Sequence, residues 1–145
     1  MLGELSNTGA MPALEEMVRF TAARHKVITH NIANLETPNF RAMDVDVGAF
    51  QKALQEAVKD RREETGGESG RFTAVSTDEV ELSSTGAISL NPKTPSRGAL
   101  GHDRNDADLE TLMKDLAENQ LAYRVATDLI RQQQGILKSA ISGRV

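Results

Sequence analysis

The stretch that decides the fold runs from Met11 to Leu35 and reads MPALEEMVRFTAARHKVITHNIANL. Its apolar positions recur at alternating spacings of three and four residues, the period at which side chains share one face of an α-helix. This seam consists of Met11, Leu14, Val18, Thr21, His25, Ile28, Ile32 and Leu35. Pro12 suits the first turn of a helix, and Pro38 disfavours helical backbone in the residue before it. We therefore predict an N-terminal core helix over residues 11–36.

The last forty residues carry a second seam with the same alternation of three and four. Its members are Leu109, Leu112, Leu116, Asn119, Tyr123, Ala126, Ile130, Gln133, Leu137 and Ala140. Acidic residues crowd the start of this segment and basic residues its end, as the helix dipole favours. We predict one continuous C-terminal core helix over residues 106–142, capped by Asn105 or Asp106. The polar seam residues Asn119 and Gln133 should weaken packing but fix the register.

The middle of the chain has a different character. An apolar face that includes Phe50 and Leu54 predicts a third helix over residues 46–63, within a turn-and-helix segment at 37–64. Residues 65–105 hold six of the eleven glycines and two of the four prolines, so we expect a polar central segment with an irregular fold. Three short apolar runs in it are compatible with strands, at Phe72–Val75, Val80–Leu82 and Ile88–Leu90.

These patterns predict a mainly α fold in a single structural unit of 145 residues. The two long helices should pack as a coiled-coil-like hairpin. The expected packing residues are Leu14, Val18, Ile28, Ile32, Leu109, Leu112, Leu116, Tyr123, Ile130 and Leu137. Further apolar residues flank the seams and favour contacts with helices of other subunits: Met17, Phe20, Val27, Leu129, Ile136 and Ile141. The alternative is a self-contained hairpin with a generous core.

Composition and spacing argue against an enzyme. Cysteine is absent, which removes thiolate catalysis, disulfides and cysteine-ligated metals. His25 and His30 are five apart, not the four that a helical chelate needs, and His25 suits a packed seam position. Asp44-Val45-Asp46-Val47-Gly48 fails as a calcium loop because its glycine comes one position early. We read it as an extended segment with its carboxylates outward, leading into the cap of the third helix. We expect no catalytic, cofactor or metal site.

The charge and hydropathy of the sequence limit the kinds of partner that we expect for this chain. The 17 basic and 21 acidic residues give a net charge of −4, without the basic footprint of a nucleic-acid binder. No run of 18 apolar residues is present, and residues 1–7 lack the features of a secretory signal. We expect neither a nucleic-acid partner nor a small-molecule substrate, and no cleavable signal peptide. The function classes that remain are an interaction protein and a structural protein.

One segment carries a family resemblance. Residues 31–46 read NIANLETPNFRAMDVD, which resembles the signature of the bacterial flagellar axial proteins, and the Ala42-Met43-Asp44-Val45-Asp46 continuation is similar to that of proximal-rod members. Residues 105–110 and 116–123 resemble a second block of the same family, so that the likeness spans about 14–64 and 103–141. The matched assembly motif consists of Asn31, Ile32, Ala33, Asn34, Thr37, Pro38, Phe40, Asp44 and Asp46. The departures are His30, Asn39 and Phe40, where the family has a small polar residue, glycine and tyrosine; asparagine tolerates the left-handed backbone of such a turn.

The resemblance implies a structural subunit of the periplasmic rod of the flagellar basal body, exported unfolded without a cleavable signal. Its helical termini would form the inner core of a drive shaft, with the central segment facing outward. The implied partners are other copies of the chain, other rod proteins, and membrane-ring and export-gate proteins at the rod base. Two alternatives are a cytosolic helical adaptor or export chaperone, and another rod or hook member of the family.

Overall fold

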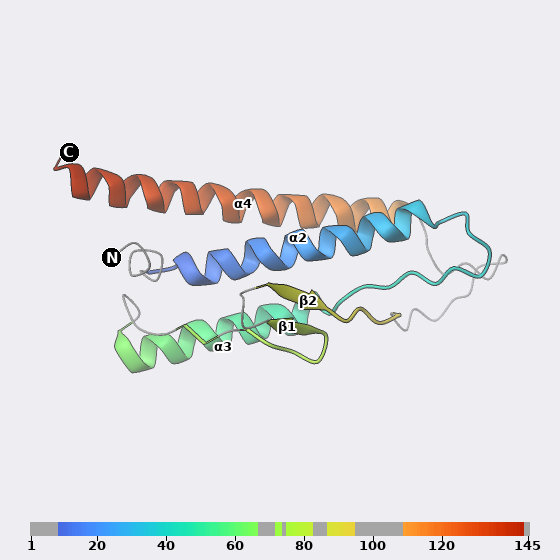
Figure 1. The fold of residues 1–145 in the computed structure, drawn as a ribbon, viewed down its shortest axis with the longest axis horizontal. Coiled ribbons are helices and arrows are strands. Elements are labelled where there is room, and N and C mark those ends of the chain that lie inside the picture. Colours follow the sequence, from blue (N-terminus) through green and yellow to red (C-terminus); the bar gives the residue numbers. More distant parts are fainter. Residues whose placement is uncertain (1–8, 67–71, 74, 83–86, 95–108, 144–145) are drawn as a thin grey trace.

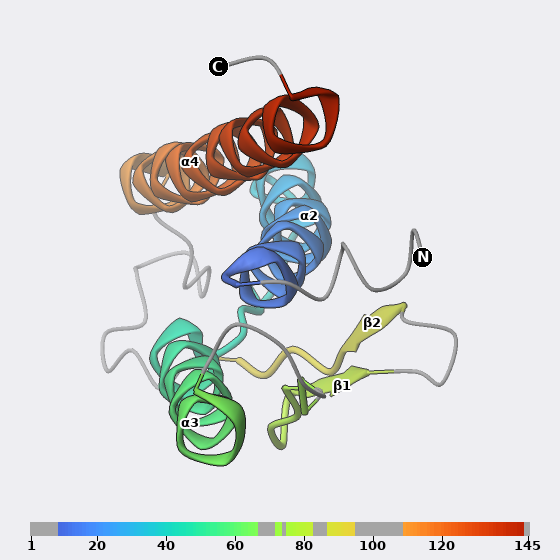
Figure 2. The same cartoon turned by 90° about the vertical axis from the view of Figure 1, so that its left-hand side faces the viewer.

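The computed structural model describes residues 9–66, 72–73, 75–82, 87–94 and 109–143. The chain order is α2 (Met11–Ala33), α3 (Val47–Thr65), β1 (Val80–Leu82), β2 (Ile88–Leu90) and α4 (Leu109–Ser142). Figure 1 shows three layers, with α4 on one side of α2 and with α3 and the two strands on the other. Figure 2, turned by 90°, shows the same order, so α2 is the central element of the molecule. The mainly helical fold predicted from the sequence is confirmed.

Helix α2 begins at Met11, as predicted from Pro12, and ends slightly earlier than predicted. Pro12 occupies its first turn, and the backbone N–H of Leu14 donates to the carbonyl of Ala10. We predicted an end at residue 36, but the helix stops at Ala33. The reason is local: the N–H of Leu35 donates to Ile32 and that of Thr37 to Asn34, so tight three-residue turns replace the helical pattern.

Helix α4 lies antiparallel along α2, which forms the predicted hairpin of N- and C-terminal helices (Figure 1). Ile28 of α2 is buried, as are Leu112 and Ala126 of α4. Asn119 is also buried, and its side-chain amide donates to the carbonyl of Thr21 at 2.9 Å. This bond satisfies a polar group inside an apolar interface and ties the two helices in one register. The predicted cap of this helix at Asn105 or Asp106 lies outside the described residues.

Helix α3 is bounded by two residues suited to its ends. Asp46 is the N-cap, and its carboxylate accepts a hydrogen bond from the N–H of Ala49 at 2.9 Å. Gly66 closes the helix in the left-handed conformation, with φ 75°, and its N–H donates to the carbonyl of Arg62. The cap expected from the alternating acids is confirmed, although the helix runs to Thr65 rather than residue 63.

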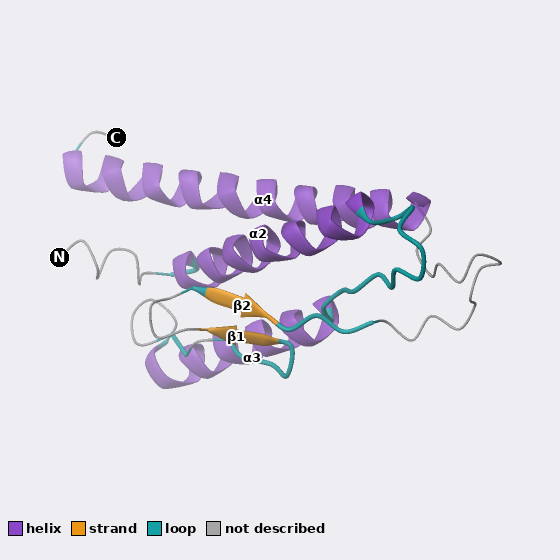
Figure 3. Ribbon diagram, turned by 45° about the vertical axis from the view of Figure 1, so that its right-hand side comes forward, coloured by secondary structure: helices purple, strands orange, loops and turns teal. Residues whose placement is uncertain are grey.

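The central segment contributes an antiparallel hairpin, which Figure 3 shows in orange beside α3. Its strands have the bounds predicted for Val80–Leu82 and Ile88–Leu90, and Val80 pairs with Leu90. The predicted strand at Phe72–Val75 is wrong, since none of its described residues is in a strand. The hairpin is also held to the linker before α3, because Asp44 and Lys93 exchange backbone hydrogen bonds of 3.0 Å.

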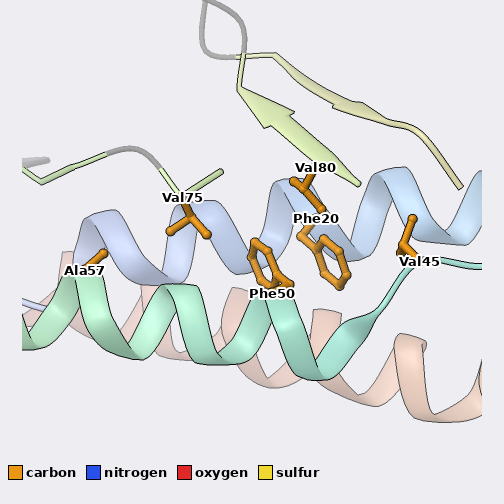
Figure 4. Close-up of a cluster of buried hydrophobic side chains, with 6 residues drawn as sticks. All are labelled: Phe20, Val45, Phe50, Ala57, Val75 and Val80. Atoms are coloured by element: carbon orange, nitrogen blue, oxygen red, sulfur yellow. The ribbon is translucent and has the colours of Figure 1, made fainter. Parts of the chain in front are cut away.

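A cluster of buried apolar side chains lies between α2, α3 and the hairpin. Its buried members, drawn in Figure 4, are Phe20, Val45, Phe50, Ala57, Val75 and Val80. The rings of Phe20 and Phe50 stack with their centroids 3.9 Å apart and their planes 5° from parallel. We predicted from the sequence that Phe20 would contact a neighbouring subunit. This prediction is wrong, because α3 of the same chain covers Phe20. The central segment also supplies Val75 and Val80 to this core.

Candidate assembly surface

The turn after α2 is held by the side chain of Asn31, which pairs with the backbone of Met43. Asn31 is buried, its amide donates to the carbonyl of Met43 at 2.6 Å, and its side-chain oxygen accepts from the N–H of Met43 at 3.1 Å. Both polar groups of one linker residue are thereby satisfied by one helical side chain. Asn31 therefore fixes the path by which the chain leaves α2 and turns back towards α3.

The turn itself accommodates the residues that differ from the family pattern. Asn39 has φ 60°, and it is the one non-glycine residue with positive φ in the described part of the chain. The expectation that asparagine would support this turn in place of glycine is confirmed. The rings of His30 and Phe40 meet edge to face with centroids 5.8 Å apart. Phe40 therefore packs across the turn without the hydroxyl of the family's tyrosine.

A second link between linker and helix is an ion pair. Arg24 donates to Asp44 through Nε at 2.9 Å and through Nη2 at 2.7 Å, a bidentate geometry. Burial by itself would lower the pKa of Arg24, but its hydrogen bond to Asp44 and the charges of Asp44, Asp115 and Glu118 raise it instead. The prediction that both carboxylates of the Asp44–Asp46 segment face outward is wrong for Asp44. The sequence offered no partner for it, because Arg24 lies twenty residues away.

The assembly motif thus divides into two groups. Asn31, Asp44 and Asp46 make hydrogen bonds within the chain that hold the linker in place. The other six are half-buried or exposed, namely Ile32, Ala33, Asn34, Thr37, Pro38 and Phe40. Of these six, Thr37 and Pro38 lie exposed at the tip of the turn. The role of the motif in assembly stays a prediction.

The main apolar surface of the described residues lies on α4. Eight large hydrophobic side chains are exposed in the described part of the chain, and all belong to this helix. They are Leu109, Met113, Leu121, Tyr123, Val125, Leu129, Ile136 and Ile141. Isolated exposed hydrophobics are ordinary, but this many along one helix mark an interaction surface. The exposure of Leu129, Ile136 and Ile141 is compatible with the expectation that they contact other subunits.

The predicted packing residues take three positions. Ile28 and Leu112 are buried. Leu14, Val18, Ile32, Leu116, Ile130 and Leu137 are half-buried along the α2–α4 interface. Leu109 and Tyr123 are 49% and 42% exposed, because they lie to one side of the α4 face that contacts α2. Tyr123 also lines a groove between α2 and α4.

Sequence reasoning missed Arg24, Leu121 and Val125. The i, i+4, i+8 spacing of Leu121, Val125 and Leu129 predicts a second apolar face of α4, and this signal could have been found. Arg24 gave no such signal. His25 is half-buried at the edge of a groove between α2 and α4.

The described residues form neither a cluster of metal ligands nor a helix that could cross a membrane. No three His, Cys, Asp or Glu side chains among them lie close enough together to hold a metal ion. No helix in the same part of the chain has the length and apolar character needed to span a lipid bilayer. The surface offered by this geometry suits protein contacts.

Comparison with known proteins agrees with this reading of the surface. The chain matches no protein-family model. It is 29% identical to the flagellar basal body rod protein FlgB of Bacillus subtilis over 94% of its own length and 95% of that protein. The FlgB of Salmonella typhimurium is 27% identical over 89% of the chain, and that of Borrelia hermsii is 28% identical over 73%. Because relatives in distant bacteria carry the same name and match most of its length, the chain is a homologue of the flagellar basal body rod protein FlgB.

Proposed function

We propose that this chain is a structural subunit of the proximal rod of the flagellar basal body, and not an enzyme. The observation that carries the proposal is the similarity to FlgB proteins along nearly the whole of both chains. The fold supports it, because the exposed apolar residues gather on the long terminal helix, where other subunits can bury them.

The partners follow from the same reasoning. Other rod proteins and further copies of this chain would cover the apolar faces of α4, and membrane-ring and export-gate proteins would meet the rod at its base. Burial of apolar area contributes about 25 cal/mol per Å², so a close-packed tube of such helices gains stability with each neighbour. A shaft built in this way transmits torque through helix packing and needs no chemical step.

The motif at residues 31–46 would set the angle between the helical core and the rest of the subunit. Asn31 and the Arg24–Asp44 pair hold the linker on α2 by four hydrogen bonds. A fixed linker orients α3 and the hairpin relative to the α2–α4 pair, and the exposed turn at Thr37 and Pro38 is then presented in one geometry.

The test is genetic and structural. Deletion of the gene from its source bacterium should abolish swimming and leave basal bodies without a complete rod, and a plasmid copy should restore both. A plasmid carrying a frameshifted copy is the control. Normal swimming of the deletion strain, with intact rods in electron micrographs, would contradict the proposal.

A further inference from the structure

The first turn of α3 has a weak start of its own. Its first four residues, 47–50, include no acidic side chain, which the helix dipole would favour. A Cβ at Gly48 would lie 3.2 Å from Oδ1 of Asp46, so glycine makes room for the N-cap but disfavours helical backbone. The residue three positions after the cap, from which a glutamate can reach back to the backbone N–H of the cap, is Ala49. The helix itself therefore supplies no carboxylate for the N–H of Asp46.

Glu79, in the turn before β1, supplies this missing bond. Its Oε2 accepts a hydrogen bond of 2.7 Å from the N–H of Asp46. Oδ1 of Asp46 in turn accepts a hydrogen bond of 2.9 Å from the N–H of Ala49. These are the two bonds of a capping box. The carboxylate that reaches back comes from a residue 33 positions away instead of from the helix.

The hairpin holds Glu79 in position. The next residue, Val80, is fully buried in the apolar cluster between α2, α3 and the hairpin. The carbonyl of Glu79 accepts a hydrogen bond of 2.9 Å from the N–H of Asn91, and its Oε1 lies 3.3 Å from Nζ of Lys93. The side chain of Glu79 is 17% exposed. Because these contacts all belong to the hairpin and its core, Glu79 faces Asp46 only when the hairpin is docked beside α3 (Figure 3).

Lys93 ties the hairpin to the same linker at a second point. Its backbone exchanges two hydrogen bonds of 3.0 Å with Asp44, while its ammonium faces Glu79. The carboxylates of Asp46 and Glu79 both lie at the start of α3, and the positive charge of Lys93 offsets part of their repulsion. Since the side chain of Lys93 is 59% exposed, the ion pair alone contributes little. The backbone of the linker is thus held at both Asp44 and Asp46.

We propose that Glu79 is a positioning residue that caps α3 from the hairpin, so that the first turn of α3 is stable only while the hairpin is docked. Residues 79 and 93 follow α3 in the chain, so the helix is synthesised before the residues that complete its cap. The linker, the start of α3 and the hairpin then become ordered as one unit. The inference goes beyond the proposed function and does not depend on it, because it concerns contacts within one chain.

Amide hydrogen exchange of the full chain, followed by NMR, tests the cap. In Glu79→Ala the N–H groups of Asp46 and Phe50 should exchange about tenfold faster or more, because a bond to a charged acceptor is lost and the first turn opens. Glu79→Gln keeps an acceptor oxygen without its charge and should speed the same exchange by about threefold. The control Glu81→Ala, at an exposed position of β1, should change it by less than about twofold. Natural exchange rates in Glu79→Ala, or in Glu79→Gln if only that variant folds, would overturn the proposal.

A glutamate placed within the helix separates capping from a general contribution to stability. Ala49→Glu can make the bond to the N–H of Asp46 without the hairpin. Added to Glu79→Ala, it should return the exchange of Asp46 and Phe50 to within about twofold of the natural rates. The control Gln55→Glu adds a carboxylate at an exposed position in the middle of α3 and should restore neither. Failure of Ala49→Glu to slow the exchange, or equal rescue by Gln55→Glu, would overturn the cap.

Discussion

Single polar side chains hold the linker between α2 and α3, and Asn31 is the clearest case. Replacing it with alanine removes two hydrogen bonds to Met43 and leaves both backbone groups of that residue without their partner. Asn31→Ala should lower the free energy of unfolding by about 2–3 kcal/mol in urea titrations of the full chain. The matched control is Asn34→Ala, whose amide bonds within its own helix turn at an exposed site, with an expected change below about 0.5 kcal/mol. Equal losses in both variants would contradict this role for Asn31.

Glu16 is a second residue whose contribution can be measured, through the pH dependence of the free energy of unfolding. It is 5% exposed, one carboxylate oxygen accepts from Arg19 at 2.9 Å, and the other has no hydrogen-bond partner among the described residues. Burial raises the pKa of Glu16 above its ordinary 4.5, assisted by Glu15 and opposed by the charge and hydrogen bond of Arg19. The folded state therefore binds the proton more tightly than the unfolded chain. The stability that this provides is complete below pH 4.5 and is lost as the pH rises through the raised value.

Replacement by glutamine removes that titration. Between about pH 4 and pH 7 the free energy of unfolding of the natural chain should fall relative to that of Glu16→Gln. Urea unfolding followed by circular dichroism at several pH values measures the difference, and Glu63→Gln on the exposed face of α3 is the control. A pH-independent difference between the natural chain and Glu16→Gln would show that the carboxyl titrates alike in the folded and unfolded states.

At the scale of elements, the inner and outer faces of α4 should respond differently to the same substitution. Leu112 is 5% exposed against α2, so Leu112→Ala should cost about 2–3 kcal/mol of stability. Leu121 is 64% exposed, so Leu121→Ala should cost less than about 0.5 kcal/mol in the isolated chain. Urea titration separates the two cases. A large loss for Leu121→Ala would mean that the outer face is already covered within one molecule.

The contact between α2 and α3 depends on the stacked rings of Phe20 and Phe50. Phe50→Ala should lower the free energy of unfolding by about 3–5 kcal/mol and Phe50→Leu by less, because leucine refills part of the space. Phe40→Ala is the control, since Phe40 is only half-buried and touches His30 at the turn. If Phe40→Ala is as costly as Phe50→Ala, the core does not lie where the structure puts it.

Elements with a strong period could be predicted from the sequence, and contacts between elements mostly could not. Heptad spacing found both long helices, and their packing as a hairpin followed. The short strand at Val80–Leu82 was found from composition, yet nothing in the sequence placed it against Phe20. Arg24 and Asp44 illustrate the limit at a single site. Their pairing depends on the path of the linker, which no local pattern encodes, and Asn31 was found as a motif residue without its role.

At the scale of the whole molecule, the inner seam should be intolerant of charge. Leu116 is half-buried on the α4 face towards α2, and an aspartate there would place a carboxylate without a partner in an apolar interface. Leu116→Asp should abolish incorporation into rods and swimming, while synthesis and export of the chain continue. The matched control is Leu116→Met, which keeps the volume and should still swim. Normal motility of Leu116→Asp would count against assembly through this seam.

The most direct test of the central claim is the protein content of purified basal bodies. Quantitative mass spectrometry of hook–basal bodies from the source bacterium should find several copies of this chain per rod, and none in particles from a strain that expresses Leu116→Asp. If the chain is instead absent from basal bodies and recovered from the cytosol bound to export proteins, it is an adaptor and not a rod subunit.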